Sequence, residues 1–517
     1  MAIKSTALVA LVSILISLPT LVVLGSFFVP DYALWSHLLD TVFTRYVANS
    51  AVVAIEVAIG TFVMGVSSAW FIVNYQFPGR NIFAWALMLP LAFPGYIFAF
   101  FVQPLSAYLP FVPAREWVSF CLIMTLYPYV YLSARAAFID QSVCALEAAR
   151  TLGCNRRQAF LQVALPMARP SIVAGVTVAT MESLADYGTA QYFGLETIST
   201  GVLRTWFGHY NLTAAAQLAA TLVGAVLLLS ALERSLRSKA KFHHASHRYQ
   251  QMHLSWLSPS GRFGLTALMS FPVVVGFGLP SLWLIHQATG AENFGLNSQF
   301  FELAINSLGL AIIVALGLVP LAVMIAISRR DKPSRWSAAL AALSRLGYAT
   351  PGTVLAIGVL VPLVYIDRSL AEAGYTPLGL TTGFGGLIFA YFSRFYSVAA
   401  NTVEAGLERI HRSMNETART LGASSWRLIS KVYFPLMRGS ALAAVLMVFV
   451  DIMKELPATL VLRPFDFNTL AVRAFELASD ERLAAAAAPA LCIVLTGLIP
   501  VLYLSRQITR SRAGHGR

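Results

Sequence analysis

The chain has 517 residues, of which 57% are hydrophobic and 12% are charged, and its mean hydropathy is +0.68. This composition excludes an ordinary soluble protein of several domains and predicts a polytopic membrane protein. The net charge of +13 on its own would also fit a protein that binds nucleic acid. The four cysteines show neither metal-ligand spacing nor a paired pattern, so we expect no disulfide framework; they are Cys121, Cys144, Cys154 and Cys492.

The membrane-spanning helices are predicted from long apolar runs. The run from Thr6 to Val29 is too long for the core of a signal peptide, so we interpret it as a first membrane helix that stays in the mature protein. A span needs about 20 largely apolar residues. Twelve stretches meet this condition: 6–29, 47–73, 82–106, 116–138, 171–193, 212–232, 263–286, 303–328, 343–366, 378–401, 439–462 and 484–505.

The positions of Lys and Arg predict the orientation of these spans. Most of the 37 basic residues fall in segments that are cytoplasmic if the N-terminus lies inside. An even number of spans then places both termini in the cytoplasm. The same distribution explains the positive net charge without a nucleic-acid partner, since membrane lipid is the anionic surface beside these segments.

Residues of the first half recur in the same order in the second half. The recurrence lies 257 residues further along for the early spans and 269 residues further along from residue 147 onward. We therefore predict an all-α membrane protein of two parallel six-helix repeats, related by pseudo-twofold symmetry about the membrane normal. The predicted parts are a first half (1–233), a basic cytoplasmic linker (234–262) and a second half (263–517). The residues that recur at 257 are Asn49, Ser50, Ala54, Gly60, Pro94, Gly95 and Ala99.

The linker contains four histidines in a basic segment. An HHxxH pattern can bind a metal, but such a cluster is more often a solvated loop near anionic headgroups. No acidic residue or cysteine stands nearby to complete a metal site, so the solvated loop is the favoured interpretation. The histidines are His243, His244, His247 and His253.

Two polar and basic stretches stand between long apolar segments. Residues 147–166 read EAARTLGCNRRQAFLQVALP and residues 416–435 read ETARTLGASSWRLISKVYFP. In each, a glycine follows the first glutamate by six positions, and a tight bend at that glycine would join two short helices. One such stretch would fit an amphipathic loop lying on the membrane surface. Two copies with the same spacing predict a docking surface that is made twice.

Both stretches resemble the EAA loop of ABC-importer permeases, the cytoplasmic helix-turn-helix that docks into an ATPase subunit. We call residues 147–166 the first coupling loop and residues 416–435 the second. The second departs from the family pattern at Thr417, where the family usually has alanine. The resemblance implies that two copies of an ABC ATPase bind the chain, through Glu147, Ala148, Ala149, Gly153 and Pro166 in one loop and Glu416, Ala418, Gly422 and Pro435 in the other.

The chain has no G-x-x-x-x-G-K-[ST] phosphate-binding loop. We therefore expect a transport subunit rather than an enzyme, with no bound cofactor and with no catalytic residue of its own. ATP and magnesium would be used by the partner subunits.

The span after each coupling loop carries two acids. Glu182 and Asp186 in the first half correspond to Asp451 and Glu455 in the second. Because the two acids of each pair are four residues apart, we expect them to share one helical face. An ionisable group within a span costs several kcal/mol unless it is paired or hydrated, so these acids and the neighbouring Lys454 are candidates for the substrate pathway.

Four carboxylates near the symmetry axis would suit a hard cation, with transient ferric iron as the hypothesis and no fixed metal site. The alternative is that Lys454 pairs with Asp451 or Glu455 and that all four acids serve helix packing. Glu56, in the second span, has no charged counterpart at Ile313, so we expect it to serve packing or gating rather than substrate binding.

Three further segments, ADYGTAQYFG (185–194), LRTWFG (203–208) and MKELPATLVLRPF (453–465), closely resemble ferric-iron permeases of binding-protein-dependent ABC importers. That resemblance implies a bacterial inner-membrane protein that receives ferric iron from a periplasmic binding protein and works by ATP-driven alternating access. Thiamine and polyamine permeases of the same class remain alternatives. An ion-coupled secondary transporter is the alternative from another class, although it has no need of two coupling loops.

Overall fold

The computed structural model of the chain describes residues 2–29, 32–140, 149, 151–238, 255–331, 335–344, 347, 350–376, 378–408, 410–422 and 425–510. These residues are almost entirely helical, as predicted. Within this described part, the extended structure is one parallel pair of two-residue strands, β1 (Tyr75–Gln76) and β2 (Ser255–Trp256). Helices dominate because a helix satisfies its own backbone hydrogen bonds where no water is present. The predicted linker histidines lie outside the described residues.

The described helices include ten that are long and apolar enough to cross a membrane, or up to eleven if one bent pair is counted as a span. The predicted count of twelve is not confirmed. The predicted span 82–106 is the bent pair, whose two parts meet at 89° between Ala92 and Gly95. The predicted span 378–401 is a helix, but it is not among the ten. This helix packs against several other helices of its unit. Less of its surface therefore faces lipid, and fewer of its side chains need to be apolar.

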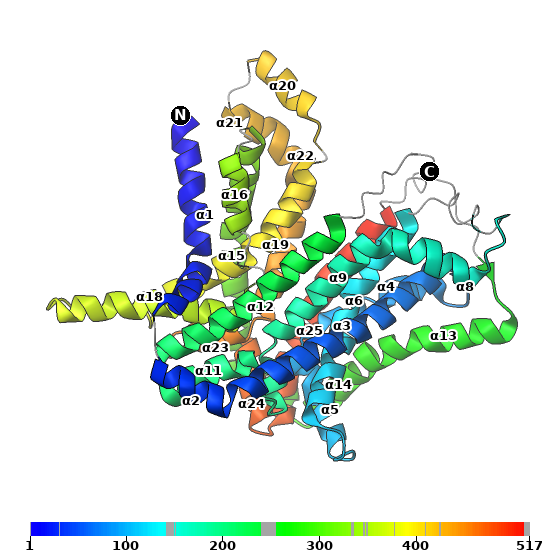
Figure 1. Cartoon of the computed structure of the whole chain (residues 1–517), viewed down its shortest axis with the longest axis horizontal. Helices are drawn as coiled ribbons and strands as arrows, with labels where there is room; N and C mark the ends of the chain where they lie inside the picture. The colour runs from blue at the N-terminus through cyan, green and yellow to red at the C-terminus, as the bar shows by residue number, and fades with distance from the viewer. Residues whose placement is uncertain are drawn as a thin grey trace. The chain divides into compact units, whose positions relative to one another are not determined.

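The chain divides into two compact units, and each combines segments from both sequence halves. The first unit contains residues 1–37, 201–223 and 296–474. In it, α1 packs against α18 and α16, and α19 packs against α15 and α22 (Figure 1). Its elements are α1 (Ala2–Gly25), η1 (Ser26–Phe28), α15 (Ser298–Asp331), α16 (Arg335–Ser344), α18 (Gly352–Glu372), α19 (Phe384–Glu408), α20 (Arg412–Thr420), α21 (Ser425–Leu428), η6 (Ile429–Tyr433), α22 (Phe434–Met453) and α23 (Pro457–Leu462).

The second unit contains residues 38–200, 224–295 and 475–517. In it, α3, α6 and α9 pack against one another, and α14 packs against α25. Its elements are α3 (Phe43–Asn74), α4 (Arg80–Ala86), η2 (Leu89–Ala92), α5 (Gly95–Ser106), α6 (Ala114–Asp140), α8 (Arg156–Ala159), η3 (Phe160–Ala164), α9 (Leu165–Ala185), α10 (Gly188–Tyr192), α13 (Pro259–Val273), η4 (Val274–Gly278), α14 (Leu279–Thr289), η5 (Glu292–Gly295) and α25 (Leu483–Arg510).

Among the described helices, four have residues in both units. They are α2 (Tyr32–Thr41), α11 (Ile198–His209), α12 (Leu212–Ser238) and α24 (Leu470–Ser479).

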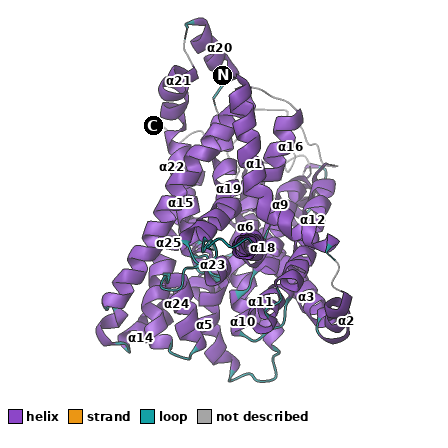
Figure 2. Ribbon diagram, turned by 90° about the vertical axis from the view of Figure 1, so that its left-hand side faces the viewer, coloured by secondary structure: helices purple, strands orange, loops and turns teal. Residues whose placement is uncertain are grey.

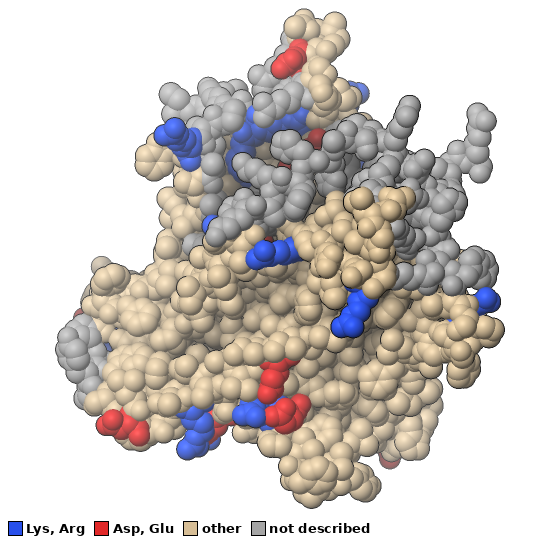
Figure 3. All heavy atoms as spheres, turned by 45° about the vertical axis from the view of Figure 1, so that its right-hand side comes forward, with Lys and Arg blue, Asp and Glu red and all other residues tan. Residues whose placement is uncertain are grey.

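Exposed apolar side chains form stripes along single helices. On α3, Ile55, Ile59 and Val63 recur every four residues and are 58%, 60% and 58% exposed. On α15, Ile305, Ile312 and Leu316 are likewise exposed. Most of the described surface on the face shown in Figure 3 belongs to uncharged residues. In water such stripes would be unfavourable, whereas in a bilayer they are the surface that faces lipid.

The two repeats share a contact between a glycine of one long helix and a side chain of a later long helix. Gly60 on α3 lies against Ile123 on α6, and Gly317 on α15 lies against Phe392 on α19. The glycines differ by 257 in number, whereas their partners differ by 269. The extra residues of the second repeat therefore lie between these helices. There, α18 has 21 residues where α5 has 12.

Candidate coupling loops and membrane carboxylates

The first coupling loop is described from Ala149 onward, except for Arg150. Glu147 and Ala148 lie outside the described residues. Gly153 has φ +90°, in the left-handed region that favours glycine, and the Cys154 amide donates back to the Ala149 carbonyl at 3.0 Å. This arrangement ends the first short helix in the way that a Schellman motif does. Asn155 and Gln158 then exchange two hydrogen bonds of 2.9 Å, a capping box that begins α8.

The second coupling loop bends in the same place. Gly422 has φ +79°, and the amide of the preceding Leu421 still donates to Thr417 at 3.1 Å. Glu416 is exposed on α20 and Ala418 is partly exposed. The start of α20 is held by His411, whose Nδ1 accepts the Ser413 amide at 3.4 Å. In both views, α20 and α21 lie beyond the end of α22 (Figures 1 and 2).

Each coupling loop presents a leucine at its bend. Leu152 is 84% exposed and Leu421 is 82% exposed, and each directly precedes the left-handed glycine. They are equivalent residues, since they differ by 269 in number. An exposed leucine at the same position in both copies makes the two bends candidate contact surfaces.

Pro166 and Pro435 do not begin new helices. Each stands inside a continuous helix, directly after a π-helical turn and one further residue: η3 precedes Leu165 and Pro166, and η6 precedes Phe434 and Pro435. The Leu165 amide donates to the Phe160 carbonyl, five residues back. A proline ring clashes with the carbonyl four residues back in an α-helix, and the wider π turn avoids that clash. The coupling loops are therefore joined to α9 and α22 without a break.

Asp186 lies just beyond the end of α9, where its backbone is extended at φ −66° and ψ 125°. Its carboxylate accepts a hydrogen bond from the Thr189 hydroxyl at 2.9 Å and another from the Ala190 amide at 3.1 Å. These donors belong to the first turn of α10. Asp186 therefore caps the short helix that begins after the break.

Glu455 holds the equivalent place after α22. Its Oε1 accepts the Ala458 amide of α23 at 2.9 Å, and its Oε2 lies 3.2 Å from Nη1 of Arg394 on α19. The Glu455 side chain is 3% exposed and that of Arg394 is 18% exposed. Thr125 stands at the position of the first repeat that corresponds to Arg394. The buried ion pair thus belongs to the second repeat.

The expectation that the two acids of each span share one helical face is wrong. Helix α9 ends at Ala185 and α22 ends at Met453, so each helix ends between its two acids. The physical reason is that Asp186 and Glu455 cap the next helix, which requires the chain to turn away there. Glu182 and Asp451 remain on their long helices and are half-buried, as is Lys454 at the end of α22.

Two further helices begin beside these carboxylates. Pro94 and Pro351 each precede a glycine that opens a helix, α5 at Gly95 and α18 at Gly352. A Cβ added to Gly95 would lie 3.4 Å from the Asp186 carboxylate, and one added to Gly352 would lie 2.6 Å from that of Glu455. The first turns of two helices therefore lie beside each carboxylate.

The role of these acids in the substrate pathway stays a prediction. Across the described residues, no three His, Cys, Asp or Glu side chains are grouped so that they could hold a metal ion. Glu56 accepts a hydrogen bond from Ser119 at 2.5 Å and lies 3.8 Å from Arg115, both at the start of α6. These contacts fit the packing role expected for Glu56.

The geometry can be compared with known proteins. A family model described as the binding-protein-dependent transport system inner membrane component matches residues 61–232 and 318–510. These two ranges make up more than half of the chain, and each contains one coupling loop. The chain belongs to this family. The permease is therefore a multi-pass membrane protein of a bacterial inner-membrane family and a transport subunit, and an ion-coupled secondary transporter is not supported.

Individual relatives match the permease to different extents. The Fe(3+)-transport system permease protein FbpB 2 of Haemophilus influenzae is 27% identical over 471 residues, which covers 89% of each chain. The sulfate transport system permease protein CysT of Escherichia coli is 26% identical over 34% of the permease and 70% of its own length. The molybdate/tungstate transport system permease protein WtpB of Pyrococcus abyssi is 24% identical over 46% of the permease and 95% of its own length. WtpB thus matches along nearly its whole length but covers only about half of the permease. This agrees with a permease that is a fused pair of repeats.

Sequence reasoning missed Arg394 as the partner of Glu455 and missed the exposed leucines. Both had a signal. An arginine in an apolar span requires a carboxylate or a hydrated site, and the neighbouring predicted span 439–462 carries two acids. Leucine precedes the glycine in both copies of the loop.

Proposed function

We propose that the permease forms the membrane path of an ATP-driven importer that carries ferric iron from a periplasmic binding protein into the cytoplasm. The observation that carries this proposal is the similarity to a ferric-iron permease along 89% of both chains. The sulfate and molybdate relatives match a third to a half of the permease. Carboxylates at the ends of α9 and α22 also favour a cation over an oxyanion.

The structure suggests how ATP would drive transport. Each coupling loop continues through a π turn into one long helix, and that helix ends at a capped break. Helix α9 runs from the first loop to Asp186, and α22 runs from the second loop to Glu455. A helix of 20 or so residues spans about 30 Å. Two ATPase subunits that drew the loops together would thereby tilt both helices and move the breaks within the membrane.

The proposed path has Glu182 and Asp451 as the acids that meet the cargo, because they lie on the long helices and not in the caps. Weak binding there would let the ion leave again on the cytoplasmic side. Both termini would lie in the cytoplasm, on the side of the ATPase subunits. Alternating access results if this path opens to the periplasm when the two ATPase subunits close on each other.

Uptake of labelled ferric iron tests the proposal, in cells that express the permease with its ATPase and binding protein. A parallel strain carries an ATPase that cannot hydrolyse ATP. We expect uptake that disappears with the inactive ATPase. Uptake that continues with the inactive ATPase would contradict the ATP-driven mechanism. An assembled complex that hydrolyses ATP but takes up no iron would contradict the cargo, and thiamine and polyamines would then be the substrates to measure.

A further inference from the structure

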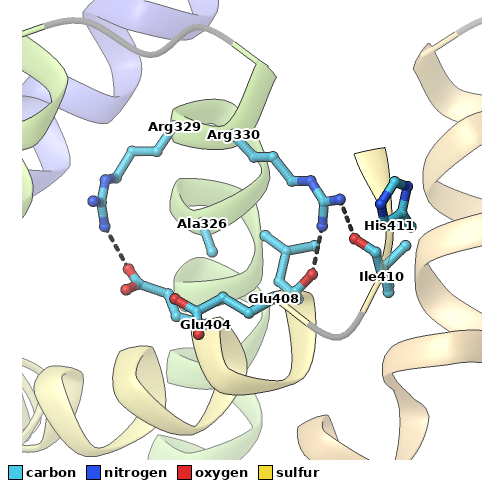
Figure 4. Close-up of a pocket in the computed structure, with 8 residues that line it drawn as sticks. Ala326, Arg329, Arg330, Glu404, Glu408, Ile410 and His411 are labelled. Atoms are coloured by element: carbon cyan, nitrogen blue, oxygen red, sulfur yellow. Dashed lines mark hydrogen bonds and ion pairs between the residues drawn. The ribbon is translucent and has the colours of Figure 1, made fainter. Parts of the chain in front are cut away.

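A cavity of about 560 Å³ lies beside the start of the second coupling loop, within the first unit. The end of α15 forms one wall, with Ala326, Arg329 and Arg330, and the end of α19 and the turn after it form the other (Figure 4). The remaining lining residues are Glu404, Leu407, Glu408, Ile410 and His411. The two arginines reach across this cavity to different targets.

Arg329 pairs with an acid on the same neighbouring helix. Its Nη1 lies 2.5 Å from Oε1 of Glu404 on α19, and both side chains are about a quarter exposed, at 28% and 25%. This ion pair joins α15 to α19.

Arg330 contacts the chain just before the second coupling loop and near the end of that loop. Its guanidinium donates to the carbonyls of Leu407 and Ile410, at the end of α19 and in the turn that leads to α20. The same guanidinium lies over the ring of Tyr433, 5.9 Å from the centroid. Tyr433 is the last residue of the π turn η6, near the end of the loop, and it is 1% exposed.

These targets suit a guanidinium. The carbonyls at the end of a helix have no partner within that helix, and they form its negative end. A planar guanidinium can donate to two carbonyls and still stack on an aromatic ring, whereas an ammonium cannot do all three in a fixed geometry. His411 comes directly after Ile410 and caps α20, so the direction of α20 depends on the turn that Arg330 holds.

The first repeat joins the equivalent three elements by aromatic packing. Trp70 on α3 packs against Phe160 of η3, at 4.7 Å between ring centroids, and edge-on against Phe138 on α6, at 5.4 Å. Phe138 corresponds to Leu407, and Phe160 corresponds to Ile429 in η6. Val73 stands in the place of Arg330. In both repeats the base of the coupling loop is therefore tied to the long helix that is not continuous with it.

We infer that Arg330 is a positioning residue for energy coupling: it fastens both ends of the second coupling loop to α15, so that a displacement of the loop by its ATPase moves α15 together with α19 and α22. The inference rests on the proposed function of the loop. Without Arg330 the loop would still be connected through the backbone to α19 and α22. ATP hydrolysis would then continue while less of the displacement reached the membrane path.

The test compares Arg330→Met with Arg329→Met in complexes reconstituted with the ATPase and the binding protein. Met keeps much of the aliphatic stem and removes the donors, and Arg329 is the matched control on the adjacent residue of the same helix. The measured quantity is cargo transported per ATP hydrolysed. We expect Arg330→Met to lower this ratio at least about fivefold while ATPase association is retained. Arg329→Met should leave it within about twofold.

The outcomes separate this inference from the function on which it rests. An unchanged ratio in Arg330→Met, with normal coupling in the wild type, would overturn the role of Arg330 alone. A wild-type permease that does not bind the ATPase would overturn the proposed function. If Arg330→Met accumulates poorly in the membrane, Arg330→Lys decides. An intermediate ratio supports the positioning role, since an ammonium retains part of the donor function, and a wild-type ratio contradicts it.

Discussion

Asp186 and Glu455 are equivalent residues of the two repeats, and each carboxylate accepts a backbone amide from the first turn of the short helix after it. They differ in their charged surroundings, since Glu455 also pairs with Arg394. In both repeats the long helix that begins at a coupling loop therefore ends at a carboxylate cap. The caps fix where each helix breaks, and the ion pair makes the second break the more strongly fastened of the two.

The ion pair predicts a specific loss of stability. Arg394→Met leaves the Glu455 carboxylate, which is 3% exposed, without its cation. We expect a destabilisation of about 3 kcal/mol, because removal of one partner leaves a buried charge uncompensated. Thermal unfolding of the purified permease in detergent measures it. The double variant Arg394→Met with Glu455→Gln should recover part of the loss, because a neutral amide tolerates burial better. If the loss of stability in the double variant equals the sum of the losses in the two single variants, the two residues do not interact.

The half-buried acids of the long helices predict a loss of transport without a loss of assembly. Glu182→Gln together with Asp451→Asn removes two negative charges while keeping the side-chain shapes. We expect iron uptake to fall at least about tenfold, since a cation in the path would lose two of its ligands. Binding to the ATPase should be retained, because neither acid lies in a coupling loop.

Glu56→Gln is the matched control for that experiment. Glu56 is also an acid in a predicted span, but it is bonded to Ser119 and lies close to Arg115. Its substitution should leave uptake within about twofold of the wild type if it serves packing only. Wild-type uptake in the double variant, or an equal fall in the Glu56 variant, would remove the case for Glu182 and Asp451 as pathway residues.

Sequence alone predicted the features that depend on local chemistry and on repetition. The duplicated coupling loops, their bends at Gly153 and Gly422, and the all-helical membrane fold result from composition, spacing and the freedom of glycine at positive φ. The ends of α9 and α22 could not be read in the same way. An apolar run continues through Asp186 and Glu455, and only tertiary contacts with the next helix make the chain turn there.

Other features depended on contacts between distant segments. Arg330 reaches Leu407 and Tyr433, which are far from it in sequence, and no motif marks that meeting. Pro166 and Pro435 lie near the start of α9 and α22. The π turn before each of them depends on a balance between the proline ring and continuous helix packing that a hydropathy pattern does not contain.

The exposed leucines at the loop tips predict that both side chains contribute to binding of the ATPase. Leu152→Asp together with Leu421→Asp places a charge at each tip, where the native side chain is more than four-fifths exposed. We expect ATPase association, measured by co-purification, to weaken at least about tenfold, because a buried anchor in an interface commonly contributes about 2 kcal/mol or more. Stability of the permease itself should be unchanged, since neither leucine is buried in it.

Leu378→Asp is the control for the leucine variants. Leu378 is 67% exposed and lies before α19, outside both coupling loops. It tests whether any exposed leucine in the chain has the same effect. Normal association in the loop variants would mean that the tips do not contact the ATPase, and equal weakening in the Leu378 variant would point to a general effect of the added charge.

The π turns predict that the prolines set the angle between each coupling loop and its span. Pro166→Ala together with Pro435→Ala restores an amide donor and removes the ring, so that each π turn can relax to α-helix. A change of one residue in helical phase rotates the rest of the helix by about 100°. We expect cargo transported per ATP hydrolysed to fall roughly 5-fold or more, while ATPase binding is retained. Pro280→Ala is the matched control, because Pro280 stands after the π turn η4 in the same way but adjoins no coupling loop. If Pro280→Ala lowers the ratio as much as the double variant, the effect comes from helix stability and not from the link between loop and span.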